Sequence, residues 1–188
     1  MRHPFSPDIK RRVKRVLTQG ADVDFAQQEG GWTPLLVAAT ELNHEGVNLL
    51  LDYNADPDKT NNREETPLMC AMIEDGLEAD RLLVVKALLE HGADVNLEYS
   101  DGHTAPDYAI ARRRTDCAVL MVKTPDFNAN KMNDEELPLT LNLAIQWRNV
   151  PVINAILPRI NDENINRNGK YWNILANAII LYLSLIHI

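Results

Sequence analysis

The stretch VLTQGADVD, from Val16 to Asp24, decides the fold because the chain contains it three times. It returns as LLDYNADPD at residues 50–58 and as LLEHGADVN at residues 88–96. In the first copy and just ahead of it, Val13, Val16 and Leu17 are spaced like one apolar stripe of a helix. One local structure written repeatedly predicts a repeat architecture.

Each copy also carries the signals that end a helix. Gly20 and Gly92 stand where the last helical turn closes through a left-handed residue, a conformation that glycine adopts without a Cβ penalty. Asn54 takes this place in the middle copy, and asparagine is the next-best residue for it. A small alanine and a turn-forming aspartate follow in every copy. They are Ala21, Ala55, Ala93, Asp22, Asp56 and Asp94.

A second signal, upstream of the two later copies, starts a helix. Thr33-Pro34-Leu35 and Thr66-Pro67-Leu68 place threonine at a capping position and proline in the first turn, where its missing N–H costs nothing. Thr33 and Thr66 are 33 residues apart. Two helices, a closing glycine and an extended loop, repeated at this period, predict a solenoid.

These residues resemble the ankyrin repeat family, whose strongest marks are the Thr-Pro-Leu helix start and the Gly-Ala-Asp-Val-Asn close. The resemblance implies an all-α fold, an ankyrin-type helix-pair solenoid with hairpin-like loops and about five units. The expected array covers residues 1–182. Its divisions are a partial unit at 7–29, repeats at 30–62, 63–100, 101–135 and 136–167, and an incomplete unit at 168–182.

The chain departs from the family pattern in three respects. After residue 100 the resemblance weakens, with helix starts expected near residues 104, 139 and 171. The histidine that usually follows Thr-Pro-Leu is replaced, which removes a hydrogen bond between repeats and predicts modest stability. The replacements are Leu36, Met69, Asp107 and Asn142. The second repeat holds five extra residues, and we expect Glu74–Asp80 to form a lengthened acidic turn.

Stacking explains why the unit must repeat. A single helix pair has two apolar sides, and each neighbouring unit covers one of them, so burial of each interface leucine contributes roughly 1.5–3 kcal/mol. End units need polar outer faces, and we expect the basic run at residues 10–15 to supply one. The same run also fits a localisation or nucleic-acid signal. Arg112–Arg114 either complement the dipole of a helix or bind an anion.

Composition limits the other classes of function. The net charge of −8 disfavours nucleic acid and membrane surfaces as partners, although residues 1–15 carry a local charge of +5. Cys70 and Cys117 are too few for a disulfide framework, and each lies in a helical apolar pattern as a small hydrophobe does. The first twenty residues contain no secretory signal. We therefore expect an intracellular, cytoplasmic monomer without membrane insertion.

The last six residues, LSLIHI at 183–188, need a separate interpretation. They are what CTG TCT CTT ATA CAC ATC encodes, a string that matches the transposon end used to tag sequencing libraries. We interpret them as translated adapter, with an ordinary helix as the rival explanation, and expect the natural protein to continue past Tyr182. The apolar tail from residue 178 is 11 residues long, too short to span a bilayer.

No motif for chemistry is present. The chain has no glycine-rich phosphate loop, no His-Glu-x-x-His and no Gly-x-Ser-x-Gly. Its five histidines share no metal-ligand spacing. We therefore expect no enzyme activity, no cofactor, no metal and no small-molecule substrate.

The resemblance implies that loop tips and first helices form a concave surface for another protein. The matching positions are Glu29, Trp32, Thr40, Glu41, Asn62, Arg63, Glu65, Ile73, Glu74, Ser100, Asp101, His103, Arg112, Gln146 and Trp147. Trp32 and Trp147 are the expected anchors, because exposed tryptophan often dominates interfaces. Leu88, Asp94, Val95 and Asn96 also resemble the pattern of an asparaginyl hydroxylase that acts on ankyrin repeats, with Asn96 as the target.

The expected function is a non-catalytic interaction module that binds another protein. Two alternatives stay open. The array can be the targeting or substrate-binding arm of a larger enzyme or secreted effector, or the cytoplasmic part of a membrane-tethered receptor or channel. The sequence downstream of Tyr182 distinguishes them.

Overall fold

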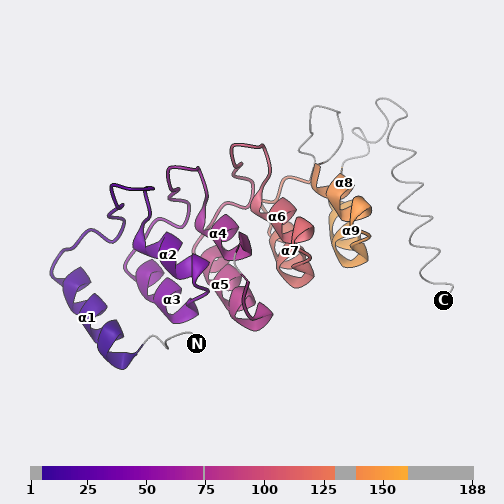
Figure 1. Cartoon of the computed structure of the whole chain (residues 1–188). Coiled ribbons are helices and arrows are strands. Elements are labelled where there is room, and N and C mark those ends of the chain that lie inside the picture. Colours follow the sequence, from indigo (N-terminus) through magenta and orange to yellow (C-terminus); the bar gives the residue numbers. More distant parts are fainter. Residues whose placement is uncertain (1–5, 74, 130–138, 161–188) are drawn as a thin grey trace. The chain divides into compact units, whose positions relative to one another are not determined.

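The computed structural model describes residues 6–73, 75–129 and 139–160 (Figure 1). In these residues the regular structure is helical, apart from one isolated antiparallel bridge between Glu98 and Thr104. The chain divides into two compact units, Met1–Ala105 and Pro106–Ile188. The predicted all-α architecture of helix pairs is confirmed.

The first unit contains a single helix followed by two helix pairs. These are α1 (Pro7–Thr18), α2 (Pro34–Thr40) with α3 (His44–Asp52), and α4 (Pro67–Ile73) with α5 (Glu78–Glu90). The partners of each pair contact one another, α2 packs against α4, and α3 packs against α5. The first helices therefore form one layer and the second helices form another (Figure 1).

The predicted helix starts are confirmed by their capping bonds. The hydroxyl of Thr33 accepts a hydrogen bond from the amide of Leu36 at 3.2 Å, and that of Thr66 accepts one from Met69 at 3.3 Å. Both threonines are buried. The caps are thus shielded from water, and proline occupies the following position in both helices.

The predicted helix ends are confirmed as well. Gly20, Asn54 and Gly92 have φ angles of 88°, 60° and 85°. In each copy the amide that follows donates back to the carbonyl five residues earlier, as Ala93 does to Leu88 at 3.0 Å. The repeated phrase therefore has one backbone conformation in all three places.

The aspartates of the phrase form a hydrogen-bond ladder along the stack. The first aspartate of each copy accepts from the backbone amide two residues later, as Asp56 does from Asp58 at 2.9 Å. The last aspartate accepts from the next copy: Asp24 from the amide of Asp56 at 3.1 Å, and Asp58 from that of Asp94 at 2.9 Å. Asp-x-Asp therefore shapes its own loop and also ties that loop to the following repeat.

The expected acidic turn at Glu74–Asp80 is wrong in its extent, because α5 already begins at Glu78. This helix has 13 residues where α3 has 9, so most of the insertion lengthens a helix. Arg81, in the first turns of α5, is fully buried. Its guanidinium donates to the carbonyl of Ala71 in α4, and its Nε lies 3.3 Å from a carboxylate oxygen of Glu78.

The core lies between the two layers and between successive pairs. Its fully buried members include Leu35, Leu68, Met69 and Leu88. Cys70 is also buried, and its burial raises the pKa of the thiol to about 12. The prediction that Cys70 and Cys117 serve as small apolar residues is confirmed by the burial of both free thiols.

The second unit contains two further helix pairs. These are α6 (Ala105–Ala111) with α7 (Thr115–Val122), and α8 (Leu139–Gln146) with α9 (Val150–Ile156), followed by a 3-10 turn at Leu157–Arg159. Both α7 and α8 pack against α9. The degenerate repeats therefore still form helices near the expected starts at 104 and 139. The expected start at 171, the incomplete unit at 168–182 and the segment 183–188 lie outside the described residues.

In this unit the side chain of Arg159 holds the loop after α7 in place. Its guanidinium donates to backbone carbonyls at the end of α7 and in the segment that follows it, at distances from 2.6 to 3.2 Å. The acceptors are Val122, Thr124, Pro125 and Phe127. One charged side chain thereby fixes a loop that lacks the Gly-Ala-Asp signal.

Candidate partner-binding surface

The first unit projects three hairpin fingers from one side of its helices (Figure 1). Each finger is closed by a backbone hydrogen bond just before the next first helix. These bonds run from Gln27 to Trp32 at 3.0 Å, from Asn61 to Glu65 at 3.2 Å and from Tyr99 to His103 at 2.8 Å. The predicted hairpin-like loops are thus present, and the first is one residue longer than the others.

A left-handed residue stands at the same place in every finger. It is Gly31, Glu64 and Gly102, with φ angles of 68°, 64° and 80°. Glycine adopts this conformation freely, whereas a glutamate at this position is strained. The fingers therefore share one backbone form even where their sequences differ.

The first two fingers are joined to each other. The amide of Asn62 donates to the carbonyl of Gly30 at 3.0 Å. Within the second finger, Oδ1 of Asn61 accepts from the amides of Arg63 at 2.9 Å and Glu65 at 3.1 Å. The tips are therefore held in place before any partner binds.

The residues expected at the surface are exposed, partly buried, buried or outside the described residues. In the first unit Glu29, Glu41, Asn62, Arg63, Ser100 and Asp101 are exposed, while Trp32, Thr40, Ile73 and His103 are partly buried. In the second unit Arg112, Gln146 and Trp147 are exposed. Glu74 lies outside the described residues.

Glu65 does not lie on the exposed surface. It is 9% exposed, and its carboxylate accepts from Nδ2 of Asn61 at 2.5 Å. This side chain therefore supports the base of the second finger. Thr40 is partly buried, and its hydroxyl donates to the carbonyl of Leu36 within α2 at 2.9 Å.

The two tryptophans have different surroundings. A Cβ added to Gly30 would lie 2.7 Å from Cδ1 of Trp32, so this ring packs on the backbone of its own finger. Trp147 is exposed, and the guanidinium of Arg113 lies 5.5 Å from its ring centroid. Such an arrangement is a cation–π contact. Sequence reasoning singled out Arg113 only as part of the basic run 112–114 and missed its contact with Trp147, because the two residues are 34 positions apart in the chain.

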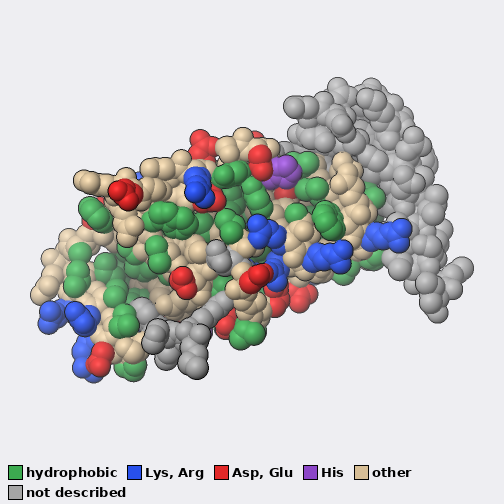
Figure 2. Space-filling model, viewed as in Figure 1, with side chains coloured by type: hydrophobic (Ala, Val, Ile, Leu, Met, Phe, Trp, Pro, Cys, Tyr) green, Lys and Arg blue, Asp and Glu red, His purple; other side chains and the backbone are tan. Residues whose placement is uncertain are grey.

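Charges of both signs are mixed among the fingers, as Figure 2 shows for the visible face. Glu29 and Asp101 are acidic, whereas Arg63 is basic. Nδ1 of His103 lies 3.2 Å from a carboxylate oxygen of Asp101. Within the residues that the structure describes, no three His, Cys, Asp or Glu side chains are grouped to hold a metal ion.

Asn96, the expected hydroxylation target, lies at the end of the third copy of the phrase. Its backbone amide and its Nδ2 both point to Oδ1 of Asp94, at 2.8 and 3.0 Å. The side chain is partly buried. Modification of Asn96 stays a prediction.

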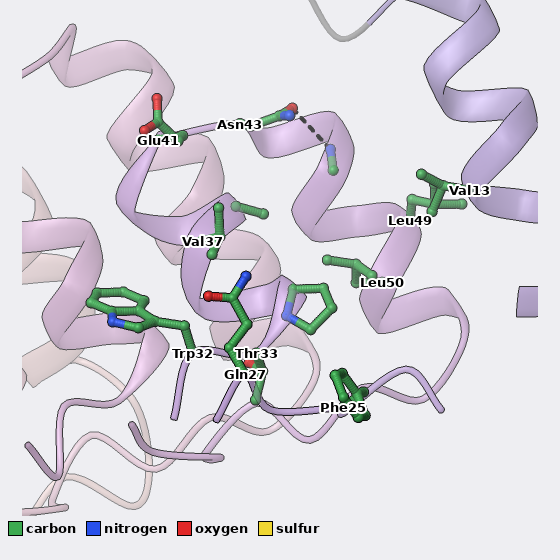
Figure 3. Close-up of a pocket in the computed structure, with 13 residues that line it drawn as sticks. Val13, Phe25, Gln27, Trp32, Thr33, Val37, Glu41, Asn43, Leu49 and Leu50 are labelled. Carbon is green, nitrogen blue, oxygen red and sulfur yellow. Dashed lines mark hydrogen bonds between the residues drawn. The ribbon is translucent and has the colours of Figure 1, made fainter. Parts of the chain in front are cut away.

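A groove that sequence reasoning missed lies between α1 and the first helix pair (Figure 3). It has a volume of about 470 Å³ and is lined mainly by apolar side chains. Val13 of α1 faces Leu49 and Leu50 of α3, while Phe25 and Val37 border the opening (Figure 3).

Comparison with known proteins agrees with this geometry. Residues 8–99 match the family described as ankyrin repeats, in three copies, so this part of the chain is a member of the ankyrin repeat family. Ankyrin repeats are protein-interaction modules. In the described part of the chain, no helix is both long and apolar enough to cross a membrane.

Three relatives illustrate the range of proteins that carry similar repeats. The 2-5A-dependent ribonuclease of Homo sapiens is 41% identical over 32% of this chain and 8% of its own length. The mitochondrial disaggregase of Bos taurus is 32% identical over 53% of this chain and 19% of its own length. Ankyrin repeat, SAM and basic leucine zipper domain-containing protein 1 of Otolemur garnettii is 40% identical over 45% and 18%. The chain thus spans less than a fifth of these relatives.

Proposed function

We propose that the array binds another protein through the exposed finger tips and the adjoining first helices, without catalytic turnover. The observation that supports this proposal is the contrast between the backbone of the three fingers and their exposed side chains. The three fingers share their closing bond and their left-handed residue, while the exposed side chains on them differ in charge and size. A rigid frame that presents variable side chains suits recognition, because little conformational entropy is lost on binding.

The proposed surface consists of those expected residues that the described structure leaves accessible. On the first unit they are the exposed or partly buried residues Glu29, Trp32, Thr40, Glu41, Asn62, Arg63, Ile73, Ser100, Asp101 and His103. On the second unit they are Arg112, Gln146 and Trp147. We further propose that the chain acts as a monomer in the cytoplasm and that its partner is a protein and not a nucleic acid.

A second candidate is favoured by the comparisons. Two of the relatives are named as a ribonuclease and a disaggregase, and this chain covers only 8% and 19% of their lengths. In this alternative the array is the targeting arm of a larger protein, and the activity resides in another domain. The finger surface then has the same role, and it selects what the larger protein acts on.

Affinity capture with a charge exchange on the fingers tests the proposal. The variant combines Glu29→Lys with Arg63→Glu, which reverses two exposed charges and leaves the net charge unchanged. The matched control, Lys86→Glu with Glu90→Lys, makes the same exchange on exposed positions of α5. All three chains are purified, checked for equal melting temperature, and used to capture proteins from extract of the source cells.

We expect a protein that binds the unaltered chain and the control but not the finger variant. With that partner purified, the dissociation constant should rise about tenfold or more for the finger variant. Equal binding of both variants would contradict the use of the fingers. Covalent turnover of the captured protein by the chain alone would contradict the non-catalytic role.

A further inference from the structure

The turn between the two helices of a pair has one backbone form in three places. Leu42, Arg113 and Arg148 have left-handed φ angles of 52°, 58° and 52°. The amide of each donates to the carbonyl three residues earlier, as Arg113 does to Ile110 at 3.0 Å. Leu42 of the first unit is buried, whereas Arg113 and Arg148 are exposed. The second unit therefore carries an arginine at the surface in both of its turns.

The two arginines line one small hollow of the second unit. Its volume is about 250 Å³, and Trp147 also lines it. The guanidinium of Arg113 lies over the ring of Trp147, 5.5 Å from its centroid. A guanidinium that stacks through its flat face still presents N–H groups at its edge, in the plane where a carboxylate binds with two hydrogen bonds. The ring thus orients Arg113 as a receptor for an anion.

The walls of the hollow are tied together below the arginines. Nδ2 of the buried Asn149 donates to the hydroxyl oxygen of Thr115 at 3.1 Å, which joins the starts of α9 and α7. Oδ1 of Asn149 accepts from the amide of Val152 at 3.4 Å. Thr115 lines the hollow and keeps its own hydroxyl proton to donate. The site therefore holds a third donor beside the two guanidinium groups.

The charge of this site is positive. Among the described residues its lining contains no Asp or Glu, and neither Arg113 nor Arg148 forms an ion pair there. Asp116, in the first turn of α7, is exposed and does not line the hollow. Residues 139–160 contain no acidic side chain at all. Charge complementarity therefore selects a negatively charged group.

The size of the hollow restricts the kind of ligand. Small-molecule pockets usually have about 300–1,000 Å³. This hollow is smaller, and it suits one or two side chains of a peptide. A nucleic-acid strand is held by many phosphate contacts along a basic groove, which two arginines on a chain of net charge −8 do not provide. The matching ligand is thus an acidic side chain of a protein.

We infer that the hollow of Arg113, Trp147 and Arg148 binds an Asp or Glu side chain of a partner protein through the edges of the two guanidinium groups. The inference rests on the proposed function, because Trp147 belongs to the proposed surface, and it gives the chemistry that the second unit recognises. Trp147 acts here by orienting Arg113.

Fluorescence anisotropy at low ionic strength tests the inference. The probe is a fluorescein-labelled Gly-Ser peptide with a central run of Glu, titrated with the full chain. The comparison peptide has Gln in place of every Glu. We expect saturable binding of the Glu peptide, about tenfold or more tighter than that of the Gln peptide, because charge-assisted hydrogen bonds to carboxylates are the strong ones.

Variants distinguish this site from a general attraction between charges. Arg113→Gln and Arg148→Gln should each weaken binding of the Glu peptide about fivefold or more. The matched control is Lys123→Gln, which removes one exposed positive charge from the same unit outside the hollow, and it should change the affinity less than about twofold. Arg113→Lys keeps the charge but not the planar fork, so it should also weaken binding.

The finger variant with Glu29→Lys and Arg63→Glu should bind the Glu peptide normally. Failure of the finger proposal would appear as unchanged capture of the partner by that variant. Failure of the present inference would appear only in the peptide titration. The two results are therefore distinguishable.

Four results would overturn the inference. They are the absence of saturable binding, equal losses for Arg148→Gln and Lys123→Gln, tighter binding of a thymidine oligonucleotide than of the Glu peptide, and peptide binding that appears only after Asp134→Asn, Glu135→Gln and Glu136→Gln. The last result would mean that the chain's own acidic residues, which lie outside the described part, occupy the hollow. Circular dichroism verifies that every variant remains folded.

Discussion

At the scale of single residues, the ladder of aspartates stabilises the stack and also concentrates charge. Asp58 accepts from the amide of Asp94, but its carboxylate also lies near the carboxylates of Asp56 and Asp94. Burial is the largest cause that raises the pKa of Asp58, and repulsion from these two carboxylates adds to it. In the third copy the equivalent position is Asn96, which retains the acceptor without the charge.

Asp58→Asn should therefore raise the melting temperature at pH 7. The folded chain binds a proton at Asp58 more readily than the unfolded chain does. The stability linked to this group is thus complete below the ordinary carboxyl pKa and is lost as the pH rises through the raised value. The site is partly solvated, so we expect a rise of only about 1–2 °C at pH 7 and none near pH 3. Thermal unfolding at both pH values measures it, and a gain of equal size at pH 3 would contradict this cause.

Glu64 occupies the left-handed position of the second finger with a φ angle of 64°, a conformation that is unfavourable for a residue with a Cβ atom. Glu64→Gly should stabilise the chain by about 0.5–1 kcal/mol, because the relief of the left-handed conformation exceeds the entropy cost of glycine. The reverse change, Gly102→Ala, should destabilise by about 1 kcal/mol, since a Cβ there meets no atom within 4 Å and only the backbone is strained. Urea denaturation gives both values. A destabilising Glu64→Gly or a stabilising Gly102→Ala would show that the fingers do not share one conformation.

At the scale of helices, the starts and ends could be predicted because their causes are local. The threonine caps act over three residues, and the closing glycine or asparagine acts at a single φ angle. The length of α5 could not be predicted in this way. Its N-cap is Leu77, whose side chain forms no capping bond, so no residue marks the start. The helix is held instead by Arg81, which reaches back to Ala71 in α4.

Arg81→Ala should destabilise the chain by about 2–3 kcal/mol, since it leaves a buried carbonyl without its donor and removes the packing of a long side chain. Glu78→Gln serves as the comparison, because that partner is 35% exposed and its loss should cost less than about 1 kcal/mol. Denaturant unfolding with both variants measures the difference. Equal, small effects would mean that the insertion contributes nothing to the stability of α5.

At the scale of the whole molecule, the sequence predicts the positions of the helical repeats better than it predicts which side chains are exposed. The period and the two signals indicate where repeats lie, but exposure depends on which neighbour covers a residue. Glu65 has the same place in its finger as Trp32, yet Asn61 binds its carboxylate and removes it from the surface. The groove beside α1 depends on the same cause, because Val16 and Leu88 have equivalent places in the phrase and opposite exposure.

The central claim is that each helix pair is stable only because its neighbours cover it. Thermal unfolding of two fragments, followed by circular dichroism, tests this most directly. Residues 1–105 are one compact unit that keeps the contacts of α2 with α4 and of α3 with α5, whereas residues 1–62 end before α4. We predict a helical, cooperatively unfolding 1–105 fragment and a 1–62 fragment without stable helix. A 1–62 fragment as helical and as stable as 1–105 would contradict the account.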